Sequence, residues 1–468
     1  MINRRRFIQL GVGGLAALRL QDQTATAAPL ATKADVIVIG AGIAGLQAAG
    51  KLKAAGKSVM VLEAQAQTGG RMTTSRSLGN DLPLDLGASW IHGIKGNPIT
   101  AIADRLKLSR VVTDYDAIQR YDFDGRALTD TESDDVDTLF NSMMKKVGTY
   151  QKSAGSTATL ESGINKATAN QRYSAFGSRA LQYAMNTEIE HEYGADTSRL
   201  SLKYWDQDGE FPGDDVIMTQ GYQQITDSLS QGLDIRLNTT VSSIDWSKST
   251  IVIRANDGTV YSAARVIVTL PLGVLKAGKV KFTPNLPATH TAAISRLGVG
   301  LLNKLYLQFP SIFWDNSVQL LGYMADTTSG AALRGAWAEW YCFNRYTGQN
   351  VLLGFNAGSY AGTVEAMTDQ ATVADAMKVL RNIYGARIPD PSGYLLTRWG
   401  KNPYSLGAYS NIAPGASGAD YDTLAKPVSK RLYFAGEHTH RTYPSTVHGA
   451  YLSGTRAATS VIADMKKT

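Results

Sequence analysis

Short runs of β-branched apolar residues predict buried strands near the start of the chain. Residues 35–39 read Asp-Val-Ile-Val-Ile, and residues 58–62 read Ser-Val-Met-Val-Leu. Continuous apolar runs of this length are typical of strands that are covered on both faces. Between them, apolar residues recur at helical spacing through Leu46 and Leu52. The pattern therefore predicts a strand–helix–strand unit over residues 35–62.

The later periodicity divides the chain into strand-rich and helical parts. Residues 235–284 contain alternating and continuous apolar runs that predict strands, whereas residues 125–200 are polar and helical in pattern. Residues 301–309 alternate, so that Lys304 falls on the face opposite to the leucines. Residues 431–437 predict a strand that ends in Gly-Glu. We therefore expect an α/β protein.

A glycine-rich turn joins the first predicted strand to the first predicted helix. Residues 40–45 read Gly-Ala-Gly-Ile-Ala-Gly, and Glu63 ends the second predicted strand. In a dinucleotide cradle, Gly40 permits the tight turn, Gly42 lets the backbone approach a pyrophosphate, and Gly45 lets the helix pack closely. The helix N-terminus then offers N–H groups to phosphates, and Glu63 can accept from ribose hydroxyls. This turn alone does not distinguish FAD from NAD.

Two other segments favour FAD. Gly70 and Arg71 follow the second predicted strand and would place a guanidinium near a pyrophosphate or a flavin. Near the other end of the chain, Glu437 closes a predicted strand, and a helix rich in small residues opens at Thr446 and Val447. A helix N-terminus there could stabilise the negative charge of a reduced flavin. We therefore expect a cofactor site built from both ends of the chain.

The composition excludes several classes of protein. The chain has 468 residues, of which 44% are hydrophobic, and one cysteine, Cys342. These values exclude a disordered chain and a disulfide scaffold. No run of eighteen apolar residues appears, so we expect no membrane insertion. Residues 1–27 hold four arginines and one aspartate, which reduces the formal net charge of +7 to +4 for the remainder. Without a dense basic run, we expect no nucleic-acid partner, and we expect no metal site.

The first 27 residues are expected to form an export signal. Residues 4–6 are three arginines before Phe7 and Ile8, a short apolar stretch follows, and residues 25–27 read Ala-Thr-Ala. This order is typical of a secretory signal of the twin-arginine type. Because that route carries proteins already folded around a cofactor, it also fits a single cysteine. We expect the twin-arginine machinery as a partner and a periplasmic or secreted location.

Four longer stretches resemble the flavin amine oxidase family. They are residues 85–93, residues 200–208, residues 269–276 and residues 436–450. Within the family the chain most resembles polyamine and spermine oxidases and the amine-oxidase domain of lysine-specific histone demethylases. The resemblance covers nearly all of residues 33–468. It implies the flavin amine oxidase fold, in which a Rossmann-like FAD-binding domain is interleaved with an α+β substrate domain.

The resemblance also implies domain boundaries. We expect the FAD-binding domain to comprise residues 33–90, 215–285 and 405–468. We expect the substrate domain to comprise residues 91–214 and 286–404. The pattern of apolar residues supports this division only coarsely.

The resemblance assigns catalytic and substrate-binding roles to named residues. Lys304 would bond through water to flavin N5, although lysine on a strand usually faces solvent. His92 would face the substrate amine and take its proton, although many histidines are only structural. Tyr409 would wall the substrate side of the flavin. Glu190 would pair with the distal ammonium of a polyamine, although a solvated acidic face is an equal alternative. Trp90 and Thr446 are further expected substrate contacts.

The resemblance implies a larger set of cofactor contacts. Trp399 is expected near the flavin ring, although ordinary core packing would also explain a tryptophan there. The expected FAD contacts are Gly40, Gly42, Ala44, Gly45, Glu63, Gly70, Arg71, Ser89, Trp90, Val241, Trp399, Glu437, Thr446 and Val447.

Several departures from the family pattern bear on specificity. Thr446 stands where monoamine oxidases have a second aromatic wall, which weakens the case for small aromatic amines. Ala408 stands where they have the cysteine that bonds the flavin, so FAD is expected to be non-covalent. Gln65 replaces a frequent arginine after Glu63, so that one phosphate contact is missing. Ser89 and Trp90 replace the Met-Arg of amino-acid oxidases, which argues against amino-acid substrates.

These features together lead to an expected activity. We expect FAD-dependent oxidation of a polyamine at a C–N bond, in which hydride passes to flavin N5. The imine would hydrolyse to an aldehyde and an amine, and O2 would be reduced to H2O2. The alternatives are a monoamine or other amine oxidase or dehydrogenase, a histone demethylase, and a flavoprotein without catalysis. The sequence leaves the oligomeric state open.

Overall fold

An eight-stranded sheet forms the base of the cofactor region. The computed structural model describes residues 31–79, 81–327 and 333–466. Seven strands of the sheet follow the order β13-β10-β11-β12-β1-β2-β9, and β21 also pairs with β12. The strands are β1 (Lys33–Ile39), β2 (Val59–Leu62), β9 (Asp234–Arg236), β10 (Val241–Asp245), β11 (Ile251–Ala255), β12 (Val260–Val268), β13 (Lys281–Thr283) and β21 (Leu432–Phe434). β1 pairs in parallel with both β2 and β12.

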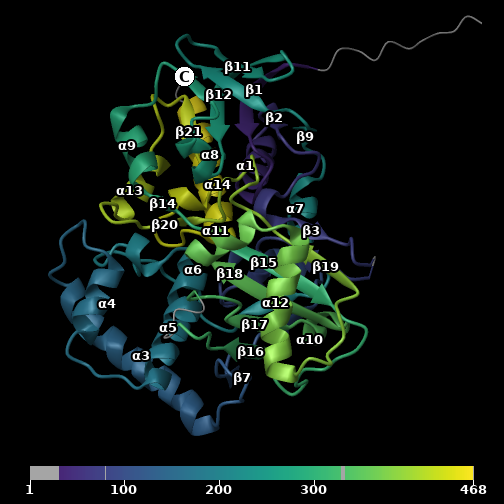
Figure 1. The fold of residues 1–468 in the computed structure, drawn as a ribbon. Helices are drawn as coiled ribbons and strands as arrows, with labels where there is room; N and C mark the ends of the chain where they lie inside the picture. Colours follow the sequence, from purple (N-terminus) through teal and green to yellow (C-terminus); the bar gives the residue numbers. More distant parts are fainter. Residues whose placement is uncertain (1–30, 80, 328–332, 467–468) are drawn as a thin grey trace, which may run out of the picture. The chain divides into compact units, whose positions relative to one another are not determined.

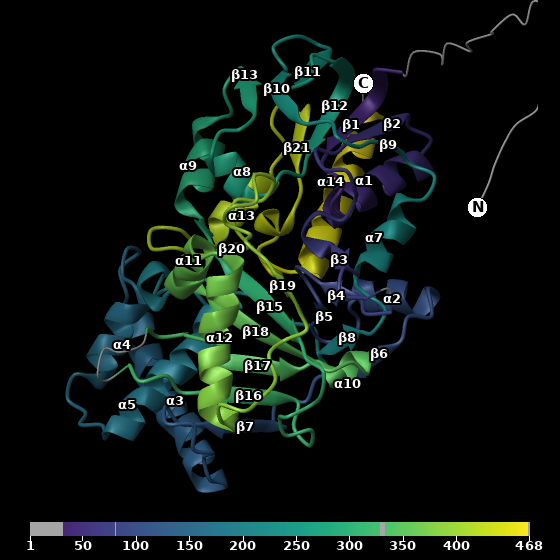
Figure 2. The same ribbon diagram turned by 45° about the vertical axis from the view of Figure 1, so that its right-hand side comes forward.

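Two helices from opposite ends of the chain pack side by side against this sheet. They are α1 (Ile43–Ala54) and α14 (Val447–Met465), and both views show their adjacency (Figure 1 and Figure 2). Small residues permit the close approach, because a Cβ on Gly454 would lie 2.2 Å from the carbonyl oxygen of Ala44. The strand–helix–strand unit predicted over residues 35–62 is confirmed.

A six-stranded sheet forms the base of the second region. Its order is β19-β15-β18-β17-β16-β7, and helix α12 (Asp369–Tyr384) lies across one face (Figure 2). The strands are β7 (Ile118–Tyr121), β15 (Leu302–Gln308), β16 (Leu320–Tyr323), β17 (Glu339–Cys342), β18 (Val351–Ala357) and β19 (Gly393–Leu396). β15 and β18 pair antiparallel, which sets Lys304 opposite Phe355. Buried aromatic and aliphatic side chains fill the space between sheet and helix.

Residues 130–193 form a separate group of helices (Figure 1). The group consists of α3 (Asp130–Gln151), α4 (Leu160–Thr168), α5 (Ala175–Met185), a π-helical turn η2 (Asn186–Glu190) and α6 (His191–Tyr193). α3 begins at a capping box, in which Thr129 and Glu132 exchange hydrogen bonds. The helical prediction for residues 125–200 is therefore confirmed.

Shorter elements connect these parts. The remaining strands are β3 (Thr74–Ser75), β4 (Leu84–Asp85), β5 (Trp90–Ile91), β6 (Arg110–Val112), β8 (Val216–Met218), β14 (Gly298–Val299) and β20 (Ser410–Asn411). The remaining helices are α2 (Pro98–Arg105), α7 (Gln223–Ser230), α8 (Leu272–Lys276), α9 (Ala288–Arg296), α10 (Asn344–Thr347), α11 (Gly358–Ala366) and α13 (Gly418–Ala425). The 3-10 turns are η1 (Gly70–Met72), η3 (Thr197–Arg199) and η4 (Glu437–Thr439).

The expected domain division and the expected export signal both stay predictions. Contacts group residues 33–468 into one unit, so the proposed division into two domains stays a prediction. The expected export signal over residues 1–27 lies outside the described residues. Among the helices of the described residues, none combines the length and apolar character needed to cross a membrane.

Candidate active site

One large cavity runs from the glycine-rich turn to the six-stranded sheet. Its volume is about 1510 Å³, whereas a pocket for one drug-sized ligand is typically about 300–1,000 Å³. Its walls come from both ends of the chain and from the segments between them. The cavity therefore has room for a dinucleotide and a substrate together.

The glycine-rich turn forms one end of this cavity. Gly40 has a φ of +105°, which favours glycine. A Cβ on Gly45 would lie 2.0 Å from the carbonyl oxygen of Gly40, so only glycine fits there. The Glu63 carboxylate accepts from the backbone N–H groups of Ala41 and Gln65 and lines the cavity. Burial raises the pKa of Glu63 above its usual value.

The start of α1 has the features of an anion site. Gly42 caps the helix without a side chain, and the first turn contains no acidic residue. The N–H groups of the first turn therefore lack side-chain acceptors, and Gly42, Ile43 and Ala44 line the cavity. Unpaired N–H groups and the positive end of the helix dipole together favour a phosphate.

A buried ion pair ties the two ends of the chain together. Arg71 donates to the Glu437 carboxylate at 2.9 Å and to the Ala408 carbonyl at 2.6 Å. Glu437 also accepts from the Ser410 hydroxyl and from the Ser445 N–H. Burial opposes the charge of Glu437, but the Arg71 guanidinium and these hydrogen bonds hold its pKa below the usual value. The pair fixes the Arg71 guanidinium at the cavity wall.

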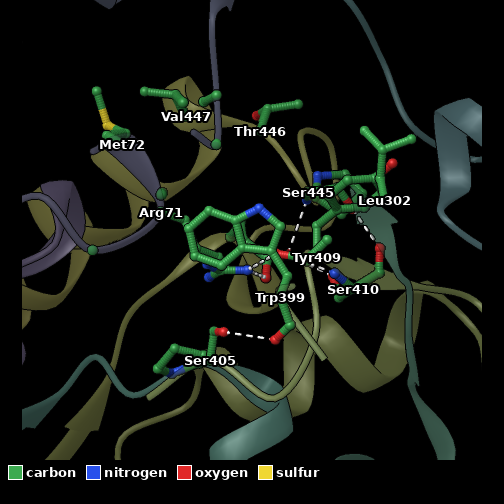
Figure 3. Close-up of a pocket in the computed structure, with 18 of the residues that line it drawn as sticks. Arg71, Met72, Leu302, Trp399, Ser405, Tyr409, Ser410, Ser445, Thr446 and Val447 are labelled. Atoms are coloured by element: carbon green, nitrogen blue, oxygen red, sulfur yellow. Dashed lines mark hydrogen bonds and ion pairs between the residues drawn. The ribbon is translucent and has the colours of Figure 1, made fainter. Parts of the chain in front are cut away.

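The start of α14 and an indole ring form the next part of the wall. Thr446 caps α14 by accepting from the Gly449 N–H, and Val447 opens the helix. Trp399 lines the same cavity as Arg71, Met72, Thr446 and Val447 (Figure 3). The Trp399 indole donates to the Leu86 carbonyl at 3.2 Å. This fixed flat ring could lie against a flavin.

The remaining expected cofactor residues also lie at the cavity wall. Gly70, Ser89, Trp90 and Val241 line it, whereas Gly45 lies behind the turn as a packing residue. FAD requires donor and acceptor groups of particular kinds. The site supplies them as the uncapped start of α1, the fixed guanidinium of Arg71 and the buried carboxylate of Glu63. The residues present therefore fit this cofactor.

Lys304 is buried in the wall of the cavity. Its amine donates to the carbonyls of Asp85 and Gly87, at 3.0 and 2.6 Å, and forms a third hydrogen bond with the Ser89 hydroxyl. Burial lowers the pKa of Lys304, and the nearby Asp85 carboxylate opposes that shift. The solvent-facing alternative is wrong, because only 4% of Lys304 is exposed.

His92 belongs to a chain of hydrogen bonds at the cavity wall. Its Nδ1 lies 2.7 Å from a carboxylate oxygen of Asp215, which also accepts from the Gly93 N–H and the Tyr115 hydroxyl. The His92 side chain is 51% exposed, and it lines the cavity. Partial desolvation at the cavity wall opposes its charge, but the Asp215 carboxylate outweighs this effect and raises the pKa of His92. With Nδ1 engaged, Nε2 is the nitrogen left for a ligand.

Tyr409 lines the same part of the cavity and is fixed in place. Its hydroxyl donates to the His191 carbonyl at 2.6 Å. Burial raises the pKa of Tyr409 well above its usual value, so the ring stays neutral. Thr446 uses its hydroxyl to donate to the Tyr443 carbonyl and cap α14. Of the two positions expected to wall the flavin, Tyr409 and Thr446, only Tyr409 therefore carries an aromatic ring.

The structure corrects the prediction for Glu190. This residue is 2% exposed, does not line the cavity and pairs with Arg334 at 2.6 Å. Its carboxylate also accepts from the side chain of Asn186 and from the Thr197 N–H. Glu190 is therefore a structural residue that cannot reach a substrate ammonium. Its neighbours Glu188 and Glu192 line the cavity instead.

Sequence reasoning missed several polar residues at the cavity wall. They are Glu188, Glu192, Asp206, Asp208, Glu210, Asp215 and Glu339. The alternation of acids over residues 188–192 was a usable signal, because residues four apart share a helix face. No local signal marks Asp215 or Glu339, since each is distant in sequence from its histidine partner. Among the described residues, no group of His, Cys, Asp or Glu could hold a metal.

Comparison with known proteins agrees with this geometry. A family model described as flavin containing amine oxidoreductase matches residues 43–462. Lysine-specific histone demethylase 1 homolog 2 of Oryza sativa subsp. japonica is 35% identical over 447 residues, covering 93% of this chain and 58% of the relative. Lysine-specific histone demethylase 2 of Homo sapiens is 34% identical, covering 92% of this chain and 53% of the relative. The chain thus spans a little over half the length of these relatives.

A solved structure shares the fold. It is a double mutant of putrescine oxidase with redesigned cofactor binding, with a TM-score of 0.73 and 20% sequence identity. The match covers 92% of this chain and 99% of that chain. The predicted fold, a Rossmann-like FAD-binding part interleaved with an α+β part, is confirmed. The chain belongs to the flavin-containing amine oxidoreductase family, and its cofactor is FAD.

Proposed function

We propose that the protein is an FAD-dependent oxidase of polyamines of the spermidine and spermine class. The observation that carries this proposal is an acidic wall of the cavity near Tyr409 and His92. The wall consists of Glu192, Asp206, Asp208, Glu210 and Asp215. Polyamines carry several ammonium groups at neutral pH, and carboxylates are the groups that pair with them.

Glu192 shows why a cation is favoured there. Burial raises its pKa, and the negative charges of Asp208, Asp215 and Glu210 raise it further, although His92 opposes them. Carboxylates that repel one another in this way are stabilised when a cation enters. The wall therefore favours substrates with more than one positive charge.

His92 is suited to prepare the reacting amine. An ammonium group must lose a proton before hydride leaves its neighbouring carbon. Asp215 holds Nδ1, so Nε2 can accept that proton, and the carboxylate stabilises the resulting imidazolium. Bound FAD supplies the hydride acceptor. The resulting imine hydrolyses to an aldehyde and an amine, and O2 is reduced to H2O2.

Lys304 would accept protons beside the flavin, and Tyr409 would position the substrate there. The lowered pKa of Lys304 makes its neutral form accessible near neutral pH, and two carbonyls and a hydroxyl hold its amine. The neutral amine can accept a proton that leaves the site. Tyr409 supplies an aromatic ring to the cavity wall, and the smaller Thr446 in that wall would leave room for a long aliphatic amine.

We also propose that FAD is held without a covalent bond, since Ala408 offers no nucleophile at the cavity wall. If residues 1–27 act as a twin-arginine signal, the folded holoenzyme is exported to the periplasm or secreted. Both proposals are independent of the substrate.

A second candidate activity is oxidative demethylation of a lysine side chain in a peptide. The names of the relatives that are 34–35% identical favour it. A methylated lysine is also a cationic amine, so the same acidic wall could bind it. The polyamine is favoured because several carboxylates line the cavity, which suits a small molecule with several charges.

Anaerobic titration of the purified holoprotein tests the proposal. The flavin spectrum is recorded while spermidine, spermine, putrescine, an alkyl monoamine or a methyllysine peptide is added. Bleaching by a polyamine, with colour and peroxide returning in air, is the expected result. Faster bleaching by the peptide would favour demethylation. Failure of every amine to bleach the flavin would refute an amine oxidase.

A further inference from the structure

A buried carboxylate lies behind the cavity wall that carries Lys304 and Trp399. It belongs to Glu365, in the last turn of α11, which is 5% exposed and does not line the cavity. One of its oxygens accepts from the Asn303 side chain at 2.9 Å and from the Gly400 N–H at 2.8 Å. Burying a carboxylate is costly unless donors of this kind accompany it. Glu365 is therefore held by specific hydrogen bonds.

Asn303 extends this contact to the backbone of Trp399. The amide oxygen of Asn303 accepts from the Trp399 N–H at 3.0 Å, while its NH2 group donates to Glu365. The Trp399 carbonyl accepts from the Ser405 hydroxyl at 3.0 Å (Figure 3). The N–H groups of Trp399 and Gly400 are thus held by two side chains that are bonded to each other.

Gly400 permits the close approach of the carboxylate to this loop. A Cβ at Gly400 would lie 2.8 Å from the second carboxylate oxygen of Glu365. Any side chain there would push the carboxylate away from the N–H group that it accepts from. The chain therefore has a glycine directly after the indole, at the point where Glu365 reaches the loop.

The same network reaches Lys304. Asn303 precedes Lys304 on β15, so the two side chains leave opposite faces of the strand. The Thr397 hydroxyl donates to the Asn303 amide oxygen at 3.3 Å and accepts from the Lys304 N–H at 2.9 Å. The Thr397 N–H also donates to the Lys304 carbonyl at 3.0 Å. Thr397 therefore joins the strand that carries the lysine to the loop that carries the indole.

Lys304 and Trp399 meet the same short segment at the cavity wall. The Lys304 amine donates to the carbonyls of Asp85 and Gly87, and the Trp399 indole donates to the carbonyl of Leu86 between them. A Cβ on Gly87 would lie 3.2 Å from the indole ring. Groups that act at a site must be held within about 0.5 Å by supporting contacts. The supports of the amine and of the indole converge on Asn303 and Glu365.

We propose that Glu365 is a positioning residue for the FAD site. Through Asn303 and Gly400 it fixes the Trp399 indole beside the Lys304 amine, in the place where the ring lies against the flavin. Glu365 itself touches neither cofactor nor substrate. The inference depends on FAD as the cofactor and not on which amine is oxidised, so it stands apart from the proposed polyamine activity.

Flavin spectroscopy tests the inference without turnover. An indole stacked on a flavin quenches the fluorescence of the flavin, so the fluorescence of bound FAD reports the position of Trp399. The second readout is the rate at which the holoenzyme releases FAD after dilution. Neither readout needs an amine substrate.

Two variants of Glu365 separate its hydrogen bonds from its volume. Glu365→Met removes both carboxylate oxygens at nearly the same size, and we expect about tenfold faster release of FAD and brighter bound flavin, because two buried N–H groups lose their acceptor. Glu365→Gln should stay within about twofold of the unaltered protein in both readouts. Both donors are amide N–H groups, for which a glutamine oxygen is also an acceptor.

A second variant of the wall shows whether Glu365 acts through the indole. In a Trp399→Phe background, Glu365→Met should change FAD release by no more than about twofold, because residues that act together are not additive. The structural control is Asp375→Leu in α12. It removes a carboxylate that accepts from Trp337 and Tyr360 and does not line the cavity. It should lower thermal stability and leave both flavin readouts unchanged.

Two results would overturn the inference. One is a Glu365→Met protein with unaltered flavin fluorescence and unaltered FAD release. The other is an effect of Glu365→Met that keeps its full size in the Trp399→Phe background, which would show a general loss of stability. If Glu365→Met does not fold, Gly400→Ala decides by the same two readouts, because its Cβ would displace the Glu365 carboxylate.

Discussion

The hydrogen bond between His92 and Asp215 makes a quantitative prediction for the variant Asp215→Asn. The two side-chain atoms are 2.7 Å apart, and the carboxylate raises the pKa of His92. Charges about 4 Å apart interact by about 4 kcal/mol near a protein surface and by about 1 kcal/mol in water. The His92 side chain is 51% exposed, so solvent reduces the interaction toward the smaller value. Asparagine keeps a weaker hydrogen bond, and we expect the pKa of His92 to fall by about 1 unit.

The assay is the pH dependence of kcat/KM with the fastest amine substrate. The neutral form of His92 accepts the substrate proton, so activity falls as pH decreases through the His92 pKa. Lowering that pKa moves the acid limb of the profile to lower pH by about 1 unit. The matched control, Asp134→Asn, changes an exposed carboxylate of α3 and should leave the limb in place. An unchanged acid limb in Asp215→Asn, or a shift to higher pH, would refute the role of the pair.

Three further variants test the framework of the site. Gly45→Ala places a Cβ 2.0 Å from the Gly40 carbonyl oxygen, so we expect about 3 kcal/mol of destabilisation and loss of flavin, measured by denaturant unfolding and absorbance. Gly50→Ala, in the same helix with open space around it, should instead be neutral or stabilising, and equal effects would contradict the steric argument. Arg71→Ala leaves the buried Glu437 charge unpaired, which should destabilise the fold by about 3 kcal/mol at neutral pH. Because the pKa of Glu437 is lowered in the folded protein, its contribution is present above its ordinary pKa of 4.5 and lost as pH falls through the folded value. The Arg71→Ala deficit should therefore shrink in acid, and a deficit independent of pH would exclude the pair as its source. Glu190→Gln should lower stability by about 2 kcal/mol through its buried ion pair, and a changed preference between diamines and monoamines would show that Glu190 contacts substrate.

Local patterns predicted the cofactor region well because each of its parts depends on short-range physics. The turn at Gly40 and Gly45 allows only glycine, and the runs of apolar residues on both sides form β1 and β2. The start of α14 at Thr446 follows from capping and small residues, and it too was predicted. Such features lie within a few residues of one another, so the sequence displays them directly.

The substrate side was harder to predict, because it depends on long-range packing. Helical spacing places residues 188 and 192 on one face and residue 190 on another, but it does not say which face is buried. Two features decide which face is buried. They are the π-helical turn at residues 186–190 and the pairing of Glu190 with Arg334, which is 144 residues away in the sequence. Asp215 is 123 residues from His92, and no periodicity connects them.

The contact between α1 and α14 has a consequence for the order of assembly during synthesis. The Gln47 side chain donates to Thr455, 408 positions later, and the Arg71–Glu437 pair spans 366 positions. Pairings so distant in sequence fold late, because a long loop must close before they form. The helix α1, which begins at the phosphate cradle, therefore lacks its packing partner until α14 has left the ribosome. A nascent chain that stops before α14 should therefore leave FAD unbound.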